Sequence, residues 1–180
     1  KVGLGLDQWA DAIVDGSRNS SVKIVDCSQG VHVLEKPTGK VDASMGDVHP
    51  DGNPHYWLDP RNGAPIASNI ADALAAADPA NASAYRARAE VFAGETRAAY
   101  SADSAIADRL AEKTVFTFHR SWSYFANAFR YEVAATVEPV PGIPPTARHL
   151  AELIQLAKTR HVPVLIAEPY CPSDPGKFLN

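Results

Sequence analysis

The second half of the chain alternates between short apolar runs and segments with the apolar spacing of a helix. The runs at 115–118, 132–137 and 162–167 are rich in β-branched and aromatic residues and have the length of strands. The segments between them, 122–129 and 146–159, place apolar side chains three and four positions apart. This order of strand, helix, strand, helix and strand, with short links, predicts βαβ units. We therefore expect an α/β fold with a mostly parallel sheet.

The middle of the chain carries two Asp-Pro pairs, at 59–60 and 78–79, that are typical of helix starts. Asp can cap the helix, and Pro suits its first position because the missing N–H would have had no partner there. After the second pair, residues 80–112 lack proline and carry an apolar stripe that ends at Leu110. The stripe predicts one helix, about 50 Å long at about 1.5 Å per residue. A break near Ser101–Ser104 is the alternative.

The N-terminal part of the chain is less regular. A helix is predicted over 7–17, and the β-branched run at 22–27 predicts a strand. The first residues, 1–6, also resemble a strand. Residues 28–61 are rich in Gly, Pro, Asp and His, which predicts a long loop with one short strand near 31–34. Loops of this length are usually functional or mobile.

Composition and charge narrow the classes of function. The chain has 180 residues, with 17 Lys and Arg against 21 Asp and Glu. The negative net charge of -4 and the scattered basic residues argue against a nucleic-acid surface. No run approaches the roughly 18 apolar residues of a membrane helix. The chain begins with Lys1 rather than Met, so we expect an interior piece of a longer protein, whose signal peptide would lie upstream.

Two histidines lie where chemistry is expected in an α/β protein. His119 directly follows the predicted strand 115–118, and ligands of open α/β sheets bind at the carboxyl ends of strands. His55 lies just before the helix start at 59–60. Imidazole is a good ligand for zinc and similar metals, so the pair suggests a shared metal site. The alternative for each is a helix cap or a surface residue. No HExxH or nucleophile-elbow motif is present in the sequence.

Several other polar residues are weaker candidates. Glu168 ends the predicted strand 162–167 and is a candidate ligand, an acceptor that orients an imidazole, or a partner of Arg120. Glu138 ends another strand in the same way. We expect His149 to lie on the surface and His161 to be structural. His32 and His49 flank the long loop, and His49 with Asp47 and Asp51 could capture metal loosely; a solvated loop is the alternative. A disulfide between Cys27 and Cys171 is possible from the sequence.

Five segments of the chain together resemble a known family. They are GLGLDQW at 3–9, GNPHYWLDP at 52–60, FTFHRSWSYF at 116–125, EPVPGIPP at 138–145 and AEPY at 167–170. In this order and spacing they resemble the cluster A-I substrate-binding proteins, the zinc- and manganese-binding receptors of bacterial ABC importers. The resemblance implies two α/β lobes joined by one long rigid helix, with the metal in the cleft. It divides the chain into a lobe at 1–78, the helix at 79–112 and a second lobe at 113–180.

The resemblance also implies a set of metal ligands. His55 and His119 match two ligand positions of the family, and a His rather than a Glu at the second of them favours zinc over manganese. The family's other two ligands, a His and a carboxylate, are expected outside residues 1–180. Glu168 matches a position that is not usually a ligand, so the resemblance gives it, like Arg120, a supporting role. Cys171 departs from the family pattern and could be an adventitious soft ligand.

The predicted function is therefore a receptor, not an enzyme, that captures Zn²⁺ outside the cytoplasm and delivers it to an ABC importer. The implied partners are the metal ion and the membrane permease, with no nucleic acid, and the protein is expected to be a monomer. It would work in the periplasm, or anchored to the outer surface of a Gram-positive cell. The alternatives are a manganese or iron receptor of the same family, a zinc hydrolase with Glu168 as base, and a structural or adhesive module that binds no metal.

Overall fold

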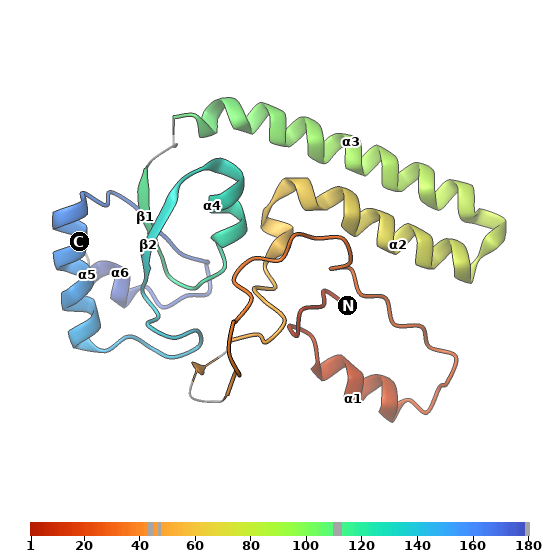
Figure 1. Ribbon diagram of the computed structural model, residues 1–180, viewed down its shortest axis with the longest axis horizontal. Coiled ribbons are helices and arrows are strands. Elements are labelled where there is room, and N and C mark those ends of the chain that lie inside the picture. The colour runs from red at the N-terminus through yellow and green to blue at the C-terminus, as the bar shows by residue number, and fades with distance from the viewer. Residues whose placement is uncertain (43–44, 47, 110–112, 179–180) are drawn as a thin grey trace. The chain divides into compact units, whose positions relative to one another are not determined.

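The protein is described here by a computed structural model, which covers residues 1–42, 45–46, 48–109 and 113–178 (Figure 1). The chain forms two compact units. Unit 1 consists of Lys1–Lys40 and His49–Asp103, and unit 2 of Val41–Val48 and Ser104–Asn180. Within the described ranges, no helix combines the length and the apolar character that a bilayer crossing requires.

Unit 2 contains the parallel sheet that the sequence predicts. Strand β1 (Thr114–Thr117) lies between β2 (Glu132–Thr136) and β3 (Leu165–Ile166), and both pairings are parallel. The helices α4 (Ser123–Phe129) and α5 (Ala147–Arg160) make the two crossovers. The α/β fold class is thus confirmed.

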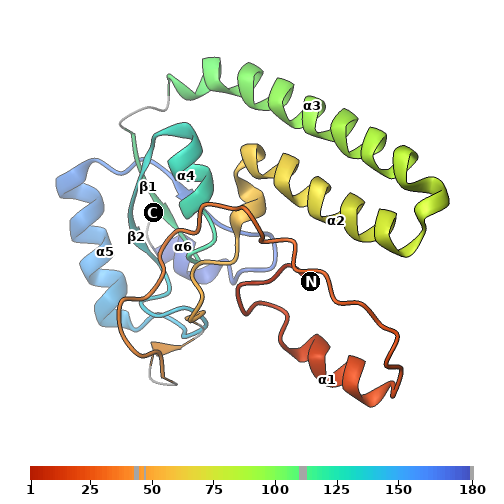
Figure 2. The same cartoon turned by 45° about the vertical axis from the view of Figure 1, so that its right-hand side comes forward.

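The strand order places a ligand-binding position at β1. The first crossover leads from β1 to β2 on one side, and the second leads back past β1 to β3. Because right-handed crossovers that run in opposite directions leave their helices on opposite faces, α4 and α5 lie on either side of the sheet (Figures 1 and 2). In such sheets the ligand crevice forms outside the carboxyl ends of β1 and β3. A short last helix, α6 (Asp174–Phe178), follows β3.

The core of unit 2 is apolar and forms between the sheet and α5. Phe116, Phe118, Val137 and Leu153 are almost fully buried in it. A second aromatic group surrounds α4, where the ring of Phe125 contacts those of its neighbours at centroid distances of 4.5 to 5.9 Å; these are Trp122, Phe129 and Tyr131. The two groups anchor the strand ends from which the candidate site projects.

Unit 1 is helical over its second half. Asp59 accepts a hydrogen bond from the backbone N–H of Arg61 at 2.9 Å, and Pro60 opens a 3-10 turn, η3 (Pro60–Asn62), that leads into α2 (Gly63–Ala77). The predicted helix start is therefore confirmed. A second 3-10 turn, η4 (Pro79–Asn81), precedes α3 (Ala82–Ala107), which continues without a break through Ser101–Ser104. Leu110, the last position of the apolar stripe, lies outside the described residues.

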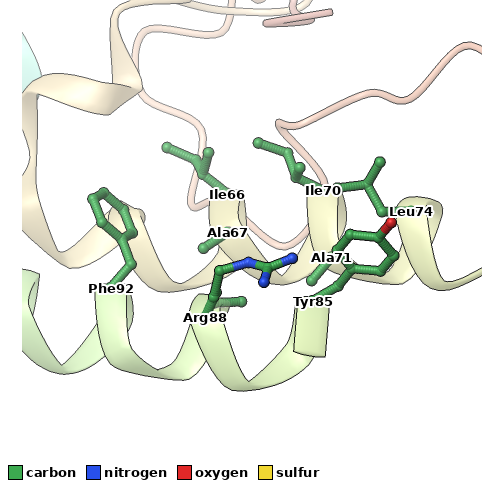
Figure 3. Close-up of a pocket in the computed structure, with 9 residues that line it drawn as sticks. Ile66, Ala67, Ile70, Ala71, Leu74, Tyr85, Arg88 and Phe92 are labelled. Carbon is green, nitrogen blue, oxygen red and sulfur yellow. The ribbon is translucent and has the colours of Figure 1, made fainter. Parts of the chain in front are cut away.

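Helices α2 and α3 pack closely at one point and leave an apolar trough at another. A Cβ added to Gly63 would lie 2.7 Å from Cγ2 and 2.9 Å from Oγ1 of Thr96, so the two helices approach through glycine there. Elsewhere between them lies a cavity of about 390 Å³ (Figure 3). Its walls are largely aliphatic and aromatic: Ile66, Ala67, Ile70, Ala71, Leu74, Tyr85, Arg88, Ala89 and Phe92.

The predicted strands of unit 1 are wrong. Its regular elements, within the part of the chain that the structure describes, are α1 (Trp9–Gly16), a short 3-10 turn η2 (Tyr56–Leu58) and the helices above. Residues 22–27 form no strand: Lys1 donates to the carbonyl of Val25 and accepts from Cys27, and the N–H of Val22 donates back to the carbonyl of Asn19. A β-branched run favours extended backbone, whereas a strand also needs a partner strand.

The first residues fail as a strand for a conformational reason. Gly3, Leu4 and Gly5 have positive φ angles of 90°, 51° and 84°, which belong to turns. A Cβ at Gly3 would overlap the carboxylate of Asp26, so glycine is required there. The short strand expected near 31–34 is also absent from the described chain, which is irregular at these residues.

Candidate metal centre

His55 lies on a buried turn whose shape depends on a glycine. Gly52 has a φ of 115°, and a Cβ there would overlap the side chain of Val33. The backbone N–H of the next residue, Asn53, donates to the carbonyl of Leu34 at 2.9 Å. The segment at 33–35 therefore runs beside the turn, which brings Glu35 close to Asn53.

The imidazole of His55 is oriented by Asn53, whose side chain is buried. Oδ1 of Asn53 lies 3.0 Å from the backbone N–H of His55 and 2.9 Å from its Nδ1. Nδ2 of Asn53 donates to Oε2 of Glu35 at 2.9 Å. The contacts with the His55 backbone N–H and with Glu35 fix the orientation of the Asn53 amide. If the amide were flipped, its NH2 group would face the N–H donor and its oxygen would face the carboxylate, and neither pair could form a hydrogen bond. Nδ1 of His55 therefore carries the proton, and the lone pair of the neutral ring lies on Nε2.

His119 follows β1, and its ring is oriented by a carboxylate. The backbone ladder continues beyond the strands, because Glu138 donates its N–H to the carbonyl of Phe118 at 3.0 Å. This register places Glu138 beside His119, and its Oε2 lies 2.6 Å from Nδ1 of the imidazole. The same oxygen accepts the N–H of Gly142 at 3.1 Å. A carboxylate oxygen accepts, so Nδ1 again carries the proton and Nε2 the lone pair.

Glu168 follows β3, and its hydrogen bonds join it to residues other than histidine. It accepts the hydroxyl of Ser121 at 2.6 Å and the thiol of Cys171 at 3.3 Å. Burial alone would raise the pKa of Glu168, but these hydrogen bonds outweigh burial and lower it. Burial and the bond to Glu168 raise the pKa of the Cys171 thiol.

Glu138, whose carboxylate bonds the imidazole of His119, is a residue that sequence reasoning placed only at the end of a strand. Glu138 follows β2 as His119 follows β1, and this equivalence of position in two adjacent parallel strands was the available signal. The roles predicted for Glu168 and Arg120 stay predictions. The side chain of Arg120 is exposed.

The remaining histidines have other surroundings. His149 is half-buried rather than on the surface, because α5 begins over the end of β2 and Nε2 of His149 donates to the carbonyl of Thr136 at 3.0 Å. His161 is the residue after α5, with a φ of 54°, and ends the helix in the left-handed conformation. His32 and Asp51 are exposed, whereas Asp47 lies outside the described residues.

The described side chains hold no complete metal cage. Within the ranges covered by the structure, no group of three or more His, Cys, Asp or Glu is arranged to bind a metal ion. His55 belongs to unit 1 and His119 to unit 2. Both cysteines are free, so the disulfide alternative is not realised.

The apolar trough of unit 1 is not a candidate for metal. Figure 3 shows Arg88 and Tyr85 as the polar side chains at its wall. The guanidinium of Arg88 lies 5.3 Å from the ring centroid of Tyr85, whose hydroxyl donates to Asp78 at 2.8 Å. A cation and a phenol among aliphatic side chains do not favour a metal cation.

Comparison with known proteins gives one family and several relatives. The model of the family described as zinc-uptake complex component A periplasmic, ZnuA, matches residues 1–178. The high-affinity zinc uptake system protein ZnuA of Brucella abortus is 28% identical over 115 residues, which are 64% of this chain and 34% of that protein.

Solved structures give the same relationship over more of the chain. A crystal structure of ZnuA matches with a TM-score of 0.81 and 28% identity, over 99% of this chain and 64% of that one. The substrate-binding protein FpvC of Pseudomonas aeruginosa, in complex with Mn²⁺, matches with a TM-score of 0.78 and 27% identity, over 99% and 63%. The chain thus spans about a third of the Brucella protein and under two thirds of each crystallised chain.

Proposed function

We propose a metal-receptor function on the premise that the chain belongs to the ZnuA family, the periplasmic component A of zinc-uptake complexes. In this function the protein captures Zn²⁺ outside the cytoplasm and delivers it to the permease of an ABC importer. It makes and breaks no covalent bond, and the metal is its cargo. We place it in the periplasm or at the outer cell surface.

One observation carries the proposal. Each of the two histidines that the sequence singles out has its Nδ1–H engaged by a neighbouring acceptor, which leaves the lone pair of the neutral ring on Nε2. Metal-binding histidines in proteins almost always donate their other ring N–H in this way, to a carboxylate, carbonyl or water. The chemistry of the pair therefore suits a divalent cation with affinity for imidazole.

The rest of the proposed site follows from family membership. We propose that His55 and His119 bind one ion from two lobes, 1–78 and 113–180, joined by the helix at 79–112. Zinc prefers four ligands, so two more are needed, and the resemblance places them outside residues 1–180. Protonation removes the lone pair of an imidazole, so the ion should be released in acid.

A manganese receptor is the second candidate, because FpvC was crystallised with Mn²⁺. Two imidazoles favour zinc, since manganese prefers oxygen ligands. The hydrolase alternative needs Glu168 as a base. The hydrogen bonds that lower the pKa of Glu168 make its carboxylate a weaker base, which argues for the receptor.

Zinc titration of the complete protein at pH 7, in competition with a chromophoric chelator, tests the proposal. We expect one tight equivalent, and a preference for Zn²⁺ when Mn²⁺ competes. His55→Ala and His119→Ala should each weaken binding by more than the roughly 10–100-fold that loss of an orienting neighbour costs. His161→Asn is the matched control, because Asn tolerates the left-handed φ of this exposed position. Unchanged affinity in both alanine variants would refute the assignment.

A further inference from the structure

We infer that Asn53 and Glu138 are positioning residues, which hold the imidazoles of His55 and His119 in the tautomer that presents Nε2 to the metal. This inference rests on the proposed function and deepens it. It concerns how the two rings are prepared before any metal arrives, and it names residues beyond the ligands themselves.

The contacts that orient His55, which we call the first arm, begin at Glu35. Its carboxylate accepts from Nδ2 of Asn53, and this contact decides which end of the amide faces His55. Glu35 has a φ of 53°, a left-handed backbone conformation that is strained for a residue other than glycine. A strained backbone persists when its surroundings over-determine it, and here it brings the carboxylate to the buried amide. Orientation thus passes from Glu35 to Asn53 and from Asn53 to His55.

Asn53 has the burial expected of such a device. It is 7% exposed, and its Oδ1 binds both the backbone N–H and Nδ1 of His55. The bond to the backbone fixes the oxygen independently of the ring. If the ring rotated away from Oδ1 or changed tautomer, this buried oxygen would lose one of its hydrogen bonds, which is unfavourable.

In the second arm, the contacts that orient His119, the acceptor is the charged carboxylate of Glu138 instead of an amide. Oε2 of Glu138 lies 2.6 Å from Nδ1 of His119, and the side chains of the two residues are 17% and 21% exposed. Hydrogen bonds to a carboxylate are shorter and stronger than those between neutral groups. A carboxylate on Nδ1–H also makes Nε2 a stronger donor toward a metal. The Gly142 N–H holds the same oxygen in place.

The two arms predict different responses to substitution. Asn53→Ala and Glu138→Ala remove the acceptors, so each ring is released to a mixture of tautomers. In Glu138→Gln, one amide oxygen can still accept from both His119 and Gly142, so the tautomer is kept and the charge is lost. In the double variant Asn53→Asp with Glu35→Gln, the amide of residue 35 donates to the carboxylate of residue 53. The other carboxylate oxygen of residue 53 can still accept from His55.

Long-range ¹H–¹⁵N correlation spectra of the metal-free complete protein report which nitrogen of each imidazole is protonated. Zinc competition titrations on the same samples report affinity. In the wild type we expect Nδ1 protonated in both rings. Asn53→Ala and Glu138→Ala should each lose this signature at their own histidine and bind zinc roughly 10–100-fold more weakly. The double variant should restore both readouts at His55, and Glu138→Gln should restore the tautomer at His119 but not the full affinity.

Matched controls separate positioning from general damage. Asn81→Ala removes an exposed amide bonded to Asp78 in unit 1, and Glu132→Gln removes an exposed carboxylate paired with Arg160 in unit 2. Neither should change a tautomer or the zinc affinity. If wild type binds zinc tightly and the two alanine variants match these controls, the inference is overturned while the receptor function stands. If wild type binds no zinc, the receptor function fails, and any tautomer change shows orientation without a metal role, which also overturns the inference.

Discussion

Replacing Tyr131 with Phe should stabilise unit 2. Tyr131 lies between α4 and β2, is 9% exposed, and packs its ring against Phe125 at a centroid distance of 5.9 Å. Its hydroxyl oxygen is buried and has no hydrogen-bond partner among the residues that the structure describes. The substitution removes this oxygen and keeps the aromatic ring.

The expected magnitude follows from the cost of an unpaired hydroxyl. Burying such a group costs about 1–3 kcal/mol in mutational data, so we expect the free energy of unfolding to rise by about 1 kcal/mol at pH 7. Burial also raises the pKa of Tyr131 from 10.0 to about 12. Because the folded pKa is the higher one, ionisation of this hydroxyl favours the unfolded state: stability is unaffected below pH 10 and falls as the pH rises toward 12.

The alkaline loss gives the prediction a second signature. A rise in pKa from 10.0 to about 12 corresponds to about 2.7 kcal/mol. Solvent screening reduces this to about 1–2 kcal/mol, because the residue as a whole is still 9% exposed. The wild type should lose this amount of stability between pH 10 and pH 12. Tyr131→Phe cannot ionise there and should lose correspondingly less.

Urea unfolding at pH 7 and at pH 11, followed by aromatic fluorescence, measures both effects. Tyr56→Phe is the control, since the hydroxyl of this buried tyrosine donates to the carbonyl of Val2 at 2.6 Å and its removal should lower stability. A Tyr131→Phe variant that is no more stable than wild type at pH 7, and equally sensitive to alkali, would refute the reasoning.

Two further substitutions test packing and acid stability. Gly63→Ala should lower the free energy of unfolding by about 1–3 kcal/mol, because the added methyl would meet the Thr96 side chain. In a Thr96→Ala background the loss should be smaller, and an equal loss in both backgrounds, measured by chemical denaturation, would contradict the contact. Burial would raise the pKa of Glu168, but its hydrogen bonds lower the pKa below the ordinary value of 4.5. The ionised carboxylate therefore stabilises the fold above pH 4.5, and this contribution is lost as the pH falls below 4.5. Ser121→Ala should therefore cost about 1–2 kcal/mol at pH 7 and progressively less as the pH falls below 4.5, and a loss that is independent of pH would count against the Ser121–Glu168 bond.

Local signals in the sequence were enough for the helices and the sheet of unit 2. The Asp59-Pro60 pair predicts a helix start because the cap and the restricted φ of proline act within a few residues. The runs at 115–118 and 132–137 predict strands that the chain itself can pair, because a helix between them returns it to the same sheet. His55 and His119 could be singled out for a similar reason, since each lies beside a recognisable element boundary.

Tertiary structure decided everything that depends on a partner distant in the chain. The run at 22–27 has the residues of a strand, but a partner strand cannot be read from the run itself. Glu138 orients His119 because the register of β2 against β1 brings residues 19 positions apart to within 2.6 Å. Asn53 orients His55 because a strained turn at Glu35 brings a carboxylate to its amide. Side-chain chemistry in the sequence thus singled out the two histidines of the proposed metal site, and long-range backbone pairing determined which neighbours orient their rings.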